Sequence, residues 1–195
     1  MAKIEDYSQI IGQSSIDDLR HIADRLKGKS VQQVNSTSVG GGVAEILNRM
    51  VPLMRELGVD TKWDVIKGGE QFFAVTKKFH NALHGNPEEI TDKELEVFLE
   101  TGRLNAQEMN IYGDVVFIHD PQPITLVDKK AGNKWAWRCH VDVSRPDPKV
   151  WGFLESYISK FDSAVFSSPV FSHELSIRQF LISPSIDPLS DKNIE

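Results

Sequence analysis

Short strand-like runs rich in β-branched and aromatic residues alternate with longer helical patterns over nearly the whole chain. The helical patterns cover residues 14–27, 43–57, 70–83, 91–109 and 148–161, and the strand-like runs cover residues 31–35, 61–67, 114–119, 135–141, 163–167 and 180–183. Strands separated by helices pair in parallel through right-handed crossovers, and the helices cover both faces of the sheet. We therefore expect an α/β protein, a single Rossmann-like three-layer domain with a mostly parallel sheet of about six strands.

The chain has 195 residues and a net charge of -6, which fits one domain spanning residues 1–195. No basic run is longer than Lys77-Lys78 or Lys129-Lys130, so the clustered positive surface that nucleic-acid binding requires is not expected. Residues 1–13 contain no hydrophobic core of a signal peptide, and the sequence has no apolar run of the ~20 residues that a membrane span needs, so neither feature is expected. Cys139 is the single cysteine, so no internal disulfide can form. We expect a soluble, cytoplasmic protein with no nucleic-acid or membrane partner.

Three consecutive glycines, Gly40, Gly41 and Gly42, separate a predicted strand from a predicted helix. Glycines let the backbone approach a ligand closely, and the unpaired amides at a helix N-terminus favour phosphate or sugar oxygens. The alternative is a tight turn that needs positive φ angles. Glu45 stands where a dinucleotide-binding loop has its third glycine, and no P-loop lysine follows, so neither NAD nor ATP is expected here.

A second polar cluster, His119-Asp120-Pro121-Gln122, follows a buried strand-like run. Ligands of parallel sheets bind at the carboxyl ends of the strands, so Asp120 could accept hydrogen bonds from sugar hydroxyls and Gln122 could add donors. The alternative for Asp120 is a helix cap, with Pro121 near the first helical position. His119 fits a packed, hydrogen-bonded structural histidine.

The third cluster is Arg138-Cys139-His140, at the end of another predicted strand. Alternation along the strand predicts that Trp137 and Cys139 face the core, while Arg138 and His140 share the opposite face. A buried arginine or histidine is costly unless it is paired or lies at the sheet edge, which favours a site role for His140. For Arg138, ligand binding and structural ion pairing are equally open, and Cys139 has no partner that would make it a nucleophile.

The sequence predicts no tightly bound metal. His80 and His84 lie four residues apart on a predicted helix, but no third ligand accompanies them. The chain also lacks the Asp-x-Asp motif of many metal-dependent sugar transferases.

Together these clusters resemble the N-terminal domain of trehalose-forming synthases, which belong to the family 4 retaining glycosyltransferases with the GT-B fold. The resemblance covers the chain from about residue 10 onward, and its motifs occupy residues 35–47, 78–83, 119–123, 137–142 and 184–189.

The resemblance implies a reaction that transfers glucose from a nucleoside-diphosphate glucose to glucose, forming trehalose with retention at the anomeric carbon. It implies that His140 and Asp120 are catalytic, that Asp120, Gln122 and Arg138 bind the acceptor, and that Gly40, Gly41 and Gly42 bind the donor phosphate and sugar. No cofactor is expected to bind tightly, although Mg²⁺ could assist the full enzyme.

The family also implies a second Rossmann-like domain with a Glu-x7-Glu element that binds the nucleotide sugar. The chain ends at Glu195, so we expect that this C-terminal domain is absent and that the isolated chain is inactive. The pairs Glu88/Glu96 and Glu100/Glu108 match the spacing by chance. The exposed interdomain face could then support a homodimer. Two alternatives remain, a non-catalytic sugar-binding module and part of a retaining trehalose phosphorylase.

Overall fold

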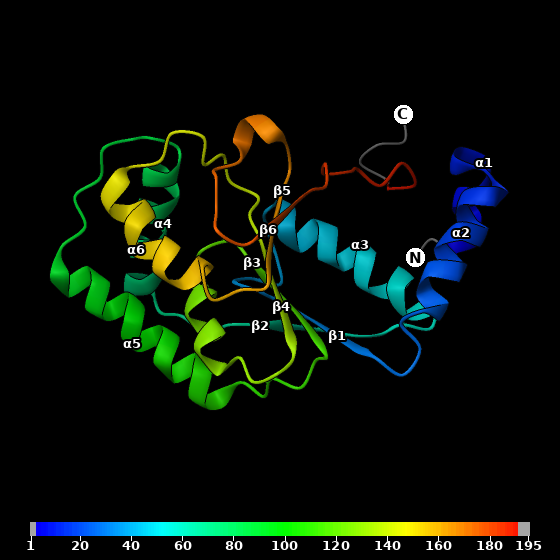
Figure 1. Cartoon of the computed structure of the whole chain (residues 1–195), viewed down its shortest axis with the longest axis horizontal. Coiled ribbons are helices and arrows are strands. Elements are labelled where there is room, and N and C mark those ends of the chain that lie inside the picture. Colours follow the sequence, from blue (N-terminus) through cyan, green and yellow to red (C-terminus); the bar gives the residue numbers. More distant parts are fainter. Residues whose placement is uncertain (1–2, 191–195) are drawn as a thin grey trace.

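The computed structural model describes residues 3–190, which contain a six-stranded sheet with every neighbouring pair parallel. The strands are β1 Ser30–Asn35, β2 Asp60–Val65, β3 Val115–His119, β4 Lys134–Arg138, β5 Ser163–Phe166 and β6 Arg178–Leu181. Their spatial order is β2-β1-β3-β4-β5-β6. The α/β, Rossmann-like architecture expected from the sequence is confirmed (Figure 1).

Two groups of helices lie on either side of this sheet (Figure 1). One group consists of α2 Gln13–Asp24 and α3 Gly42–Glu56, preceded by the short η1 Ile4–Tyr7 and α1 Ser8–Ile11. The other consists of α4 Glu70–Leu83, α5 Asp92–Glu108 and α6 Pro148–Ile158, with the 3-10 helix η2 Ile124–Lys129; η3 Pro169–Phe171 connects β5 to β6. None of the helices within residues 3–190 combines the length and apolar character that crossing a membrane would need.

The element boundaries agree with the periodicity to within three residues, and the largest differences are at the carboxyl ends of α2, β4 and α6. The strand β4 was expected to reach residue 141, but it ends at Arg138. The neighbouring β3 ends at His119 because Asp120 adopts a left-handed φ of 62°, and the N–H of Asp120 donates the last bond to the carbonyl of Arg138 at 2.9 Å. The short elements η1, α1, η2 and η3 were not expected, since three to six residues are too few to show helical periodicity.

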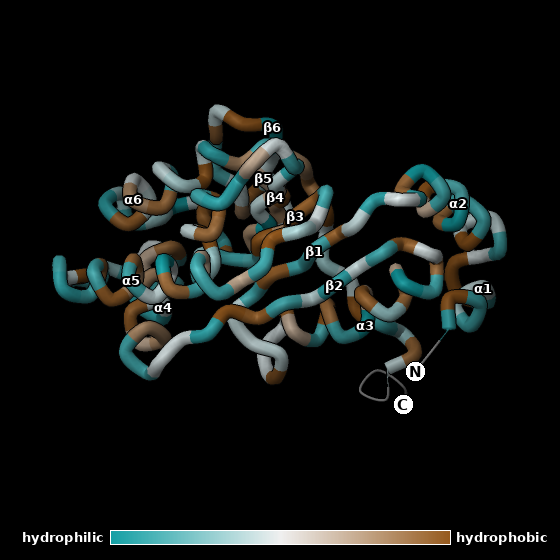
Figure 2. Tube along the Cα trace, turned by 90° about the horizontal axis from the view of Figure 1, so that it is seen from below, coloured by the Kyte–Doolittle hydropathy of each residue, from teal (hydrophilic) through white to brown (hydrophobic). Residues whose placement is uncertain are grey.

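The core is divided between the two faces of the sheet. The larger cluster, toward α4, α5 and α6, includes the fully buried Trp135, Trp137 and Phe98. The smaller one, toward α2 and α3, contains Val31, with Phe117 packed against it. Figure 2 shows hydrophobic residues along β3 beside the mixed hydropathy of the outer helices. Trp135, Trp137 and Cys139 share the larger cluster, as strand alternation predicts.

The order of the strands determines where a ligand would bind. From β1 the chain crosses to β2 on one side, whereas β3 to β6 follow one another on the other side. This reversal between β1 and β3 is a topological switch point, and parallel sheets bind ligands at the carboxyl ends of the strands that flank it. Those ends are Asn35 and His119.

Candidate functional site

The glycine loop joins the carboxyl end of β1 to the start of α3. Gly40 and Gly41 have φ angles of 73° and 82°, and Gly41 occupies the N-cap position of α3 with no side chain capping the helix. Gly42 has no positive φ, and a Cβ built on it would meet nothing within 4 Å. A tight turn therefore accounts for Gly40 and Gly41 but not for Gly42, whose missing side chain leaves the uncapped helix N-terminus open to a ligand.

Asn35 attaches this loop to the sheet. Its side-chain amide donates to the carbonyl of Thr37 at 2.8 Å, and its side-chain oxygen accepts from the indole of Trp63 at 2.7 Å. Thr37 in turn bonds the backbone of Val39 through its hydroxyl. The first half of the loop is thus held by side chains of β1 and β2, while residues 40–42 are exposed.

Asp120 lies at the end of β3 and bonds the residues that follow β4. Its carboxylate oxygen Oδ1 accepts a hydrogen bond from the main-chain N–H of His140 at 2.8 Å, and its carbonyl accepts from the indole of Trp137 at 3.1 Å. It does not cap a helix, since the N-cap position of η2 belongs to Pro123. Burial raises the pKa of Asp120 to about 7, although the residue keeps some accessible surface.

His119 and His140 form one hydrogen-bonded pair with a residue of β1. His119 Nδ1 lies 3.0 Å from His140 Nε2, and His119 Nε2 lies 2.8 Å from the side-chain oxygen of Gln33. His119 is 4% exposed, in agreement with the structural role expected from sequence. Burial lowers the pKa of His119 to about 3 and that of His140 to about 4, so both rings are neutral near pH 7.

Gln33 is the member of this site that the sequence reasoning missed. It is 2% exposed and lies on a central strand next to Gln32, which is completely buried. Buried glutamines need hydrogen-bond partners, so two of them in a central strand were a usable signal. Gln32 bonds Asp64 and the backbone at Asn110 on the other side of the strand, and Gln33 bonds His119.

Arg138 is buried, 8% exposed, and its guanidinium bonds the strands beside β4. It donates to the carbonyls of Phe166 at 3.2 Å and Ile182 at 2.7 Å, with a longer contact of 3.4 Å to the hydroxyl of Ser167. These bonds satisfy the guanidinium and join the ends of β4, β5 and β6. They favour a structural role, and acceptor binding by Arg138 stays a prediction.

Gln122 has an unsatisfied polar atom. Its side-chain oxygen is inaccessible to solvent and has no hydrogen-bond partner within the part of the chain that the structure describes. A buried acceptor without a partner is unfavourable and usually marks a site for water or a ligand. Gln122 lies two residues beyond Asp120, after the carboxyl end of β3, and acceptor binding by Gln122 stays a prediction.

The remaining candidate residues lie away from the carboxyl ends of β1, β3 and β4, or they are chemically inert. Cys139 is 1% exposed, and burial raises the pKa of its thiol well above the usual value. The rings of His80 and His84 contact each other with centroids 4.8 Å apart. Among residues 3–190, no group of three or more His, Cys, Asp or Glu side chains could hold a metal ion.

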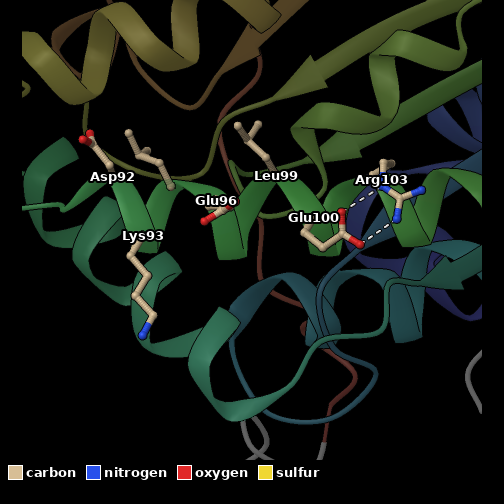
Figure 3. A pocket seen from close by; sticks show the side chains of 7 residues that line it. Asp92, Lys93, Glu96, Leu99, Glu100 and Arg103 are labelled. Carbon is tan, nitrogen blue, oxygen red and sulfur yellow. Dashed lines mark hydrogen bonds and ion pairs between the residues drawn. The ribbon is translucent and has the colours of Figure 1, made fainter.

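Two hollows on the surface also lie away from the carboxyl edge. One follows the outer side of α5, where Figure 3 shows Glu100 bonded to Arg103 beside Leu99 and Glu96. Glu96 and Glu100 belong to the two chance matches to the Glu-x7-Glu spacing, and here they lie on an exposed helix surface. The second hollow is lined by residues at the opposite ends of β3 to β6, including Val115, Lys134 and Ser163.

The chain is similar to known proteins over most of its length. Residues 33–173 match the family model described as "Trehalose synthase, N-terminal domain". The chain is 45% identical to a trehalose synthase of Thermococcus litoralis and 40% identical to one of Rubrobacter xylanophilus, with 99% and 98% of this chain aligned and 48% of each relative covered. It is 29% identical to a trehalose phosphorylase of Pleurotus pulmonarius over 86% of this chain and 26% of that protein. The chain thus spans about half the length of the synthases it matches.

Proposed function

Since this chain belongs to the family of trehalose synthase N-terminal domains, we propose that it forms the acceptor side of the active site of a retaining glucosyltransferase that makes trehalose. The donor is a nucleoside-diphosphate glucose and the acceptor is glucose. A second domain, which binds most of the donor, completes the site. The chain alone binds sugar without turning it over.

The observation that carries the proposal is the bond between the carboxylate of Asp120 and the main-chain N–H of His140. It joins the ends of β3 and β4, one strand away from the glycine loop after β1. It occupies Oδ1 of Asp120 and leaves the second carboxylate oxygen without a protein partner among residues 3–190. A carboxylate held in this way is pre-positioned to accept a hydrogen bond from a sugar hydroxyl.

The reaction needs positioning and charge stabilisation more than covalent chemistry. The bond between the anomeric carbon and the diphosphate oxygen breaks, and the oxygen of the acceptor hydroxyl forms a new bond to that carbon from the same face. The hydroxyl proton passes to the departing diphosphate, so charge and atoms balance. The transition state resembles an oxocarbenium ion with charge building on the leaving group.

Each part of the edge has a role in this scheme. The amides at the start of α3 stabilise the departing diphosphate, and the absence of a side chain at Gly42 allows close approach. Asp120 and Gln122 orient the acceptor, and His140 contacts the donor sugar near the reacting carbon. The dependence on Mg²⁺, the cytoplasmic location and a homodimer formed through an exposed interdomain face stay predictions.

A trehalose phosphorylase is the second candidate, because relatives at 29% identity carry that name. It would break or form the same glucose–glucose bond with inorganic phosphate in place of the nucleotide. The higher identity to the synthases and their fuller coverage of this chain favour a synthase over a phosphorylase.

Titration of the chain with glucose, trehalose and a nucleoside-diphosphate glucose, followed by NMR, tests the proposal. We expect the amide of Asp120 to shift with glucose and trehalose, and the amides of Gly42 and His140 to shift with the nucleotide sugar. Residues of the α5 hollow, such as Glu96 and Arg103, should not move and provide an internal control. The absence of any shift at the carboxyl edge with all three ligands would contradict a preformed acceptor side.

A further inference from the structure

Three polar side chains form a continuous hydrogen-bonded series across the carboxyl edge of the sheet. Gln33 belongs to β1, His119 is the last residue of β3, and His140 follows β4. The Gln33 side-chain oxygen lies 2.8 Å from His119 Nε2, and His119 Nδ1 lies 3.0 Å from His140 Nε2. The main-chain N–H of His140 is held separately by Asp120.

The order of donors along this series follows from its first member. A carboxamide oxygen only accepts, so His119 must carry its proton on Nε2, and the Nδ1 of a neutral His119 is then an acceptor. The group facing that acceptor must donate, which places the proton of neutral His140 on Nε2. The second ring nitrogen of His140, Nδ1, is left with a lone pair.

The surroundings keep both rings neutral, as this order requires. His119 is 4% exposed, and His140 is also largely enclosed. Burial lowers the pKa of each ring, and the nearby positive charge of Arg138 lowers both further. Within residues 3–190 no protein group bonds Nδ1 of His140, and the ring keeps part of its surface accessible.

We propose that Gln33 and His119 are positioning residues that fix the proton of His140 on Nε2, so that its Nδ1 accepts a hydrogen bond from a sugar hydroxyl. The contact between Nδ1 of His140 and a sugar hydroxyl rests on the proposed function, whereas the positions of the protons on the two rings can be tested without any sugar. The reverse order would require Gln33 to turn its amide nitrogen toward His119, and His140 would then present a donor to the ligand. The two orders therefore predict opposite roles for His140.

Two-bond ¹H–¹⁵N correlation spectra of the chain at neutral pH read the tautomers directly. We expect a proton-bearing Nε2 and a bare Nδ1 on both His119 and His140. In Gln33→Met, which removes the acceptor at similar size, the reverse tautomer of His140 should become populated, and trehalose should bind about tenfold more weakly, the factor for one lost neutral hydrogen bond.

Gln32→Met is the matched control, because it removes the same group from the same strand but from the opposite face. It disturbs the bond to Asp64 and should leave the His140 tautomer unchanged. His119→Phe is a second variant that removes the link itself and should have the same effect on His140 as Gln33→Met. A proton on Nδ1 of His140 in the wild type, or no change of its tautomer in any folded variant of Gln33 and His119, would overturn the proposal. If the tautomers follow the expected pattern but no sugar binds, the positioning roles of Gln33 and His119 hold and the proposed function fails.

Discussion

The carboxylate of Asp120 accepts a hydrogen bond from the main-chain N–H of His140 at 2.8 Å, and with the His119–His140 pair this bond joins the two polar clusters into one site. Asp120 reaches this position only because its backbone adopts a φ of 62°, a left-handed conformation that asparagine and aspartate tolerate better than other non-glycine residues. The same residue thus ends β3 and holds the chain after β4, and in the proposed function its second oxygen accepts a hydrogen bond from the sugar.

Substitution of Asp120 should separate its structural role from its charge. Asp120→Ala loses the bond to His140 and places a Cβ-only side chain in the left-handed region, so it should lower the free energy of unfolding by about 2–3 kcal/mol. Near pH 4, where Asp120 is protonated in the folded protein, Asp120→Asn keeps an acceptor oxygen and the backbone tolerance, and should cost less than about 1 kcal/mol. Urea denaturation of both variants checks this difference, which would shrink to the backbone cost of alanine if the side chain only faced solvent.

The stability of wild type relative to Asp120→Asn should depend on pH. Burial raises the pKa of Asp120 from 3.8 to about 7. Between those values the folded protein keeps a proton that the unfolded chain has released, so ionisation of Asp120 weakens folding as the pH rises from about 4 to 7. Asparagine does not ionise, so the stability of Asp120→Asn relative to wild type should increase over this window and then level off. Urea denaturation at a series of pH values measures it, and a constant difference would show that the pKa is not raised.

Alanine at neighbouring glycines should distinguish turn geometry from ligand approach. Gly41 has φ 82° and ψ 152°, a region that only glycine adopts readily, so Gly41→Ala should cost about 1–3 kcal/mol of stability. Gly42→Ala introduces a methyl group that meets nothing within 4 Å, so stability should be unchanged or slightly higher. The Gly42 variant should nevertheless bind a nucleoside-diphosphate glucose more weakly. Equal binding by wild type and Gly42→Ala would argue against donor contact at this position.

The segment after β6 is tied back to the start of the chain. The hydroxyl of Tyr7 donates to Asp187 at 2.8 Å, and Arg49 of α3 bonds the same carboxylate at 3.2 Å. Tyr7→Phe should therefore lower the free energy of unfolding by about 0.5–1.5 kcal/mol. Asp17→Asn, in an exposed contact with Arg20, should change it by less than about 0.5 kcal/mol. Thermal unfolding of both variants tests this, and equal effects would mean that Tyr7 contributes no more than a surface contact.

Two helical glycines should respond in opposite directions to alanine. A Cβ at Gly102 in α5 would lie 2.2 Å from the hydroxyl oxygen of Thr125, so Gly102→Ala should force α5 and η2 apart and cost about 1–3 kcal/mol. Gly152 in α6 is exposed, and a Cβ there meets nothing within 4 Å. Gly152→Ala should therefore stabilise the chain by about 0.5–1 kcal/mol through helix propensity. The melting temperatures of the two variants would move in the same direction only if the contact with Thr125 relaxes freely.

The long helices and the strands could be predicted from local sequence patterns, and so could the end of the sheet that carries the polar residues. Hydrophobic periodicity is a local property, so 70–83 could be assigned as a helix and 114–119 as a buried strand without knowing their neighbours. Strand–helix alternation then implied a parallel sheet, and the residues after its strands were the natural site candidates. The alternation of side chains along the strand that became β4 placed Trp137 and Cys139 in the core and Arg138 on the other face.

The hydrogen bonds among the polar residues could not be predicted in this way, because they depend on how the strands are arranged. Gln33 and His119 are 86 positions apart, and the strand order that makes β1 and β3 neighbours cannot be obtained from local patterns. The bond from Arg138 to the carbonyl of Ile182 likewise depends on the position of β6. Hydrogen bonds depend on distance and direction between groups brought together by folding, whereas periodicity records only which side of an element is apolar. For this reason Asp120 and His140 could be predicted as site residues from the sequence, but the hydrogen bonds that orient them could not.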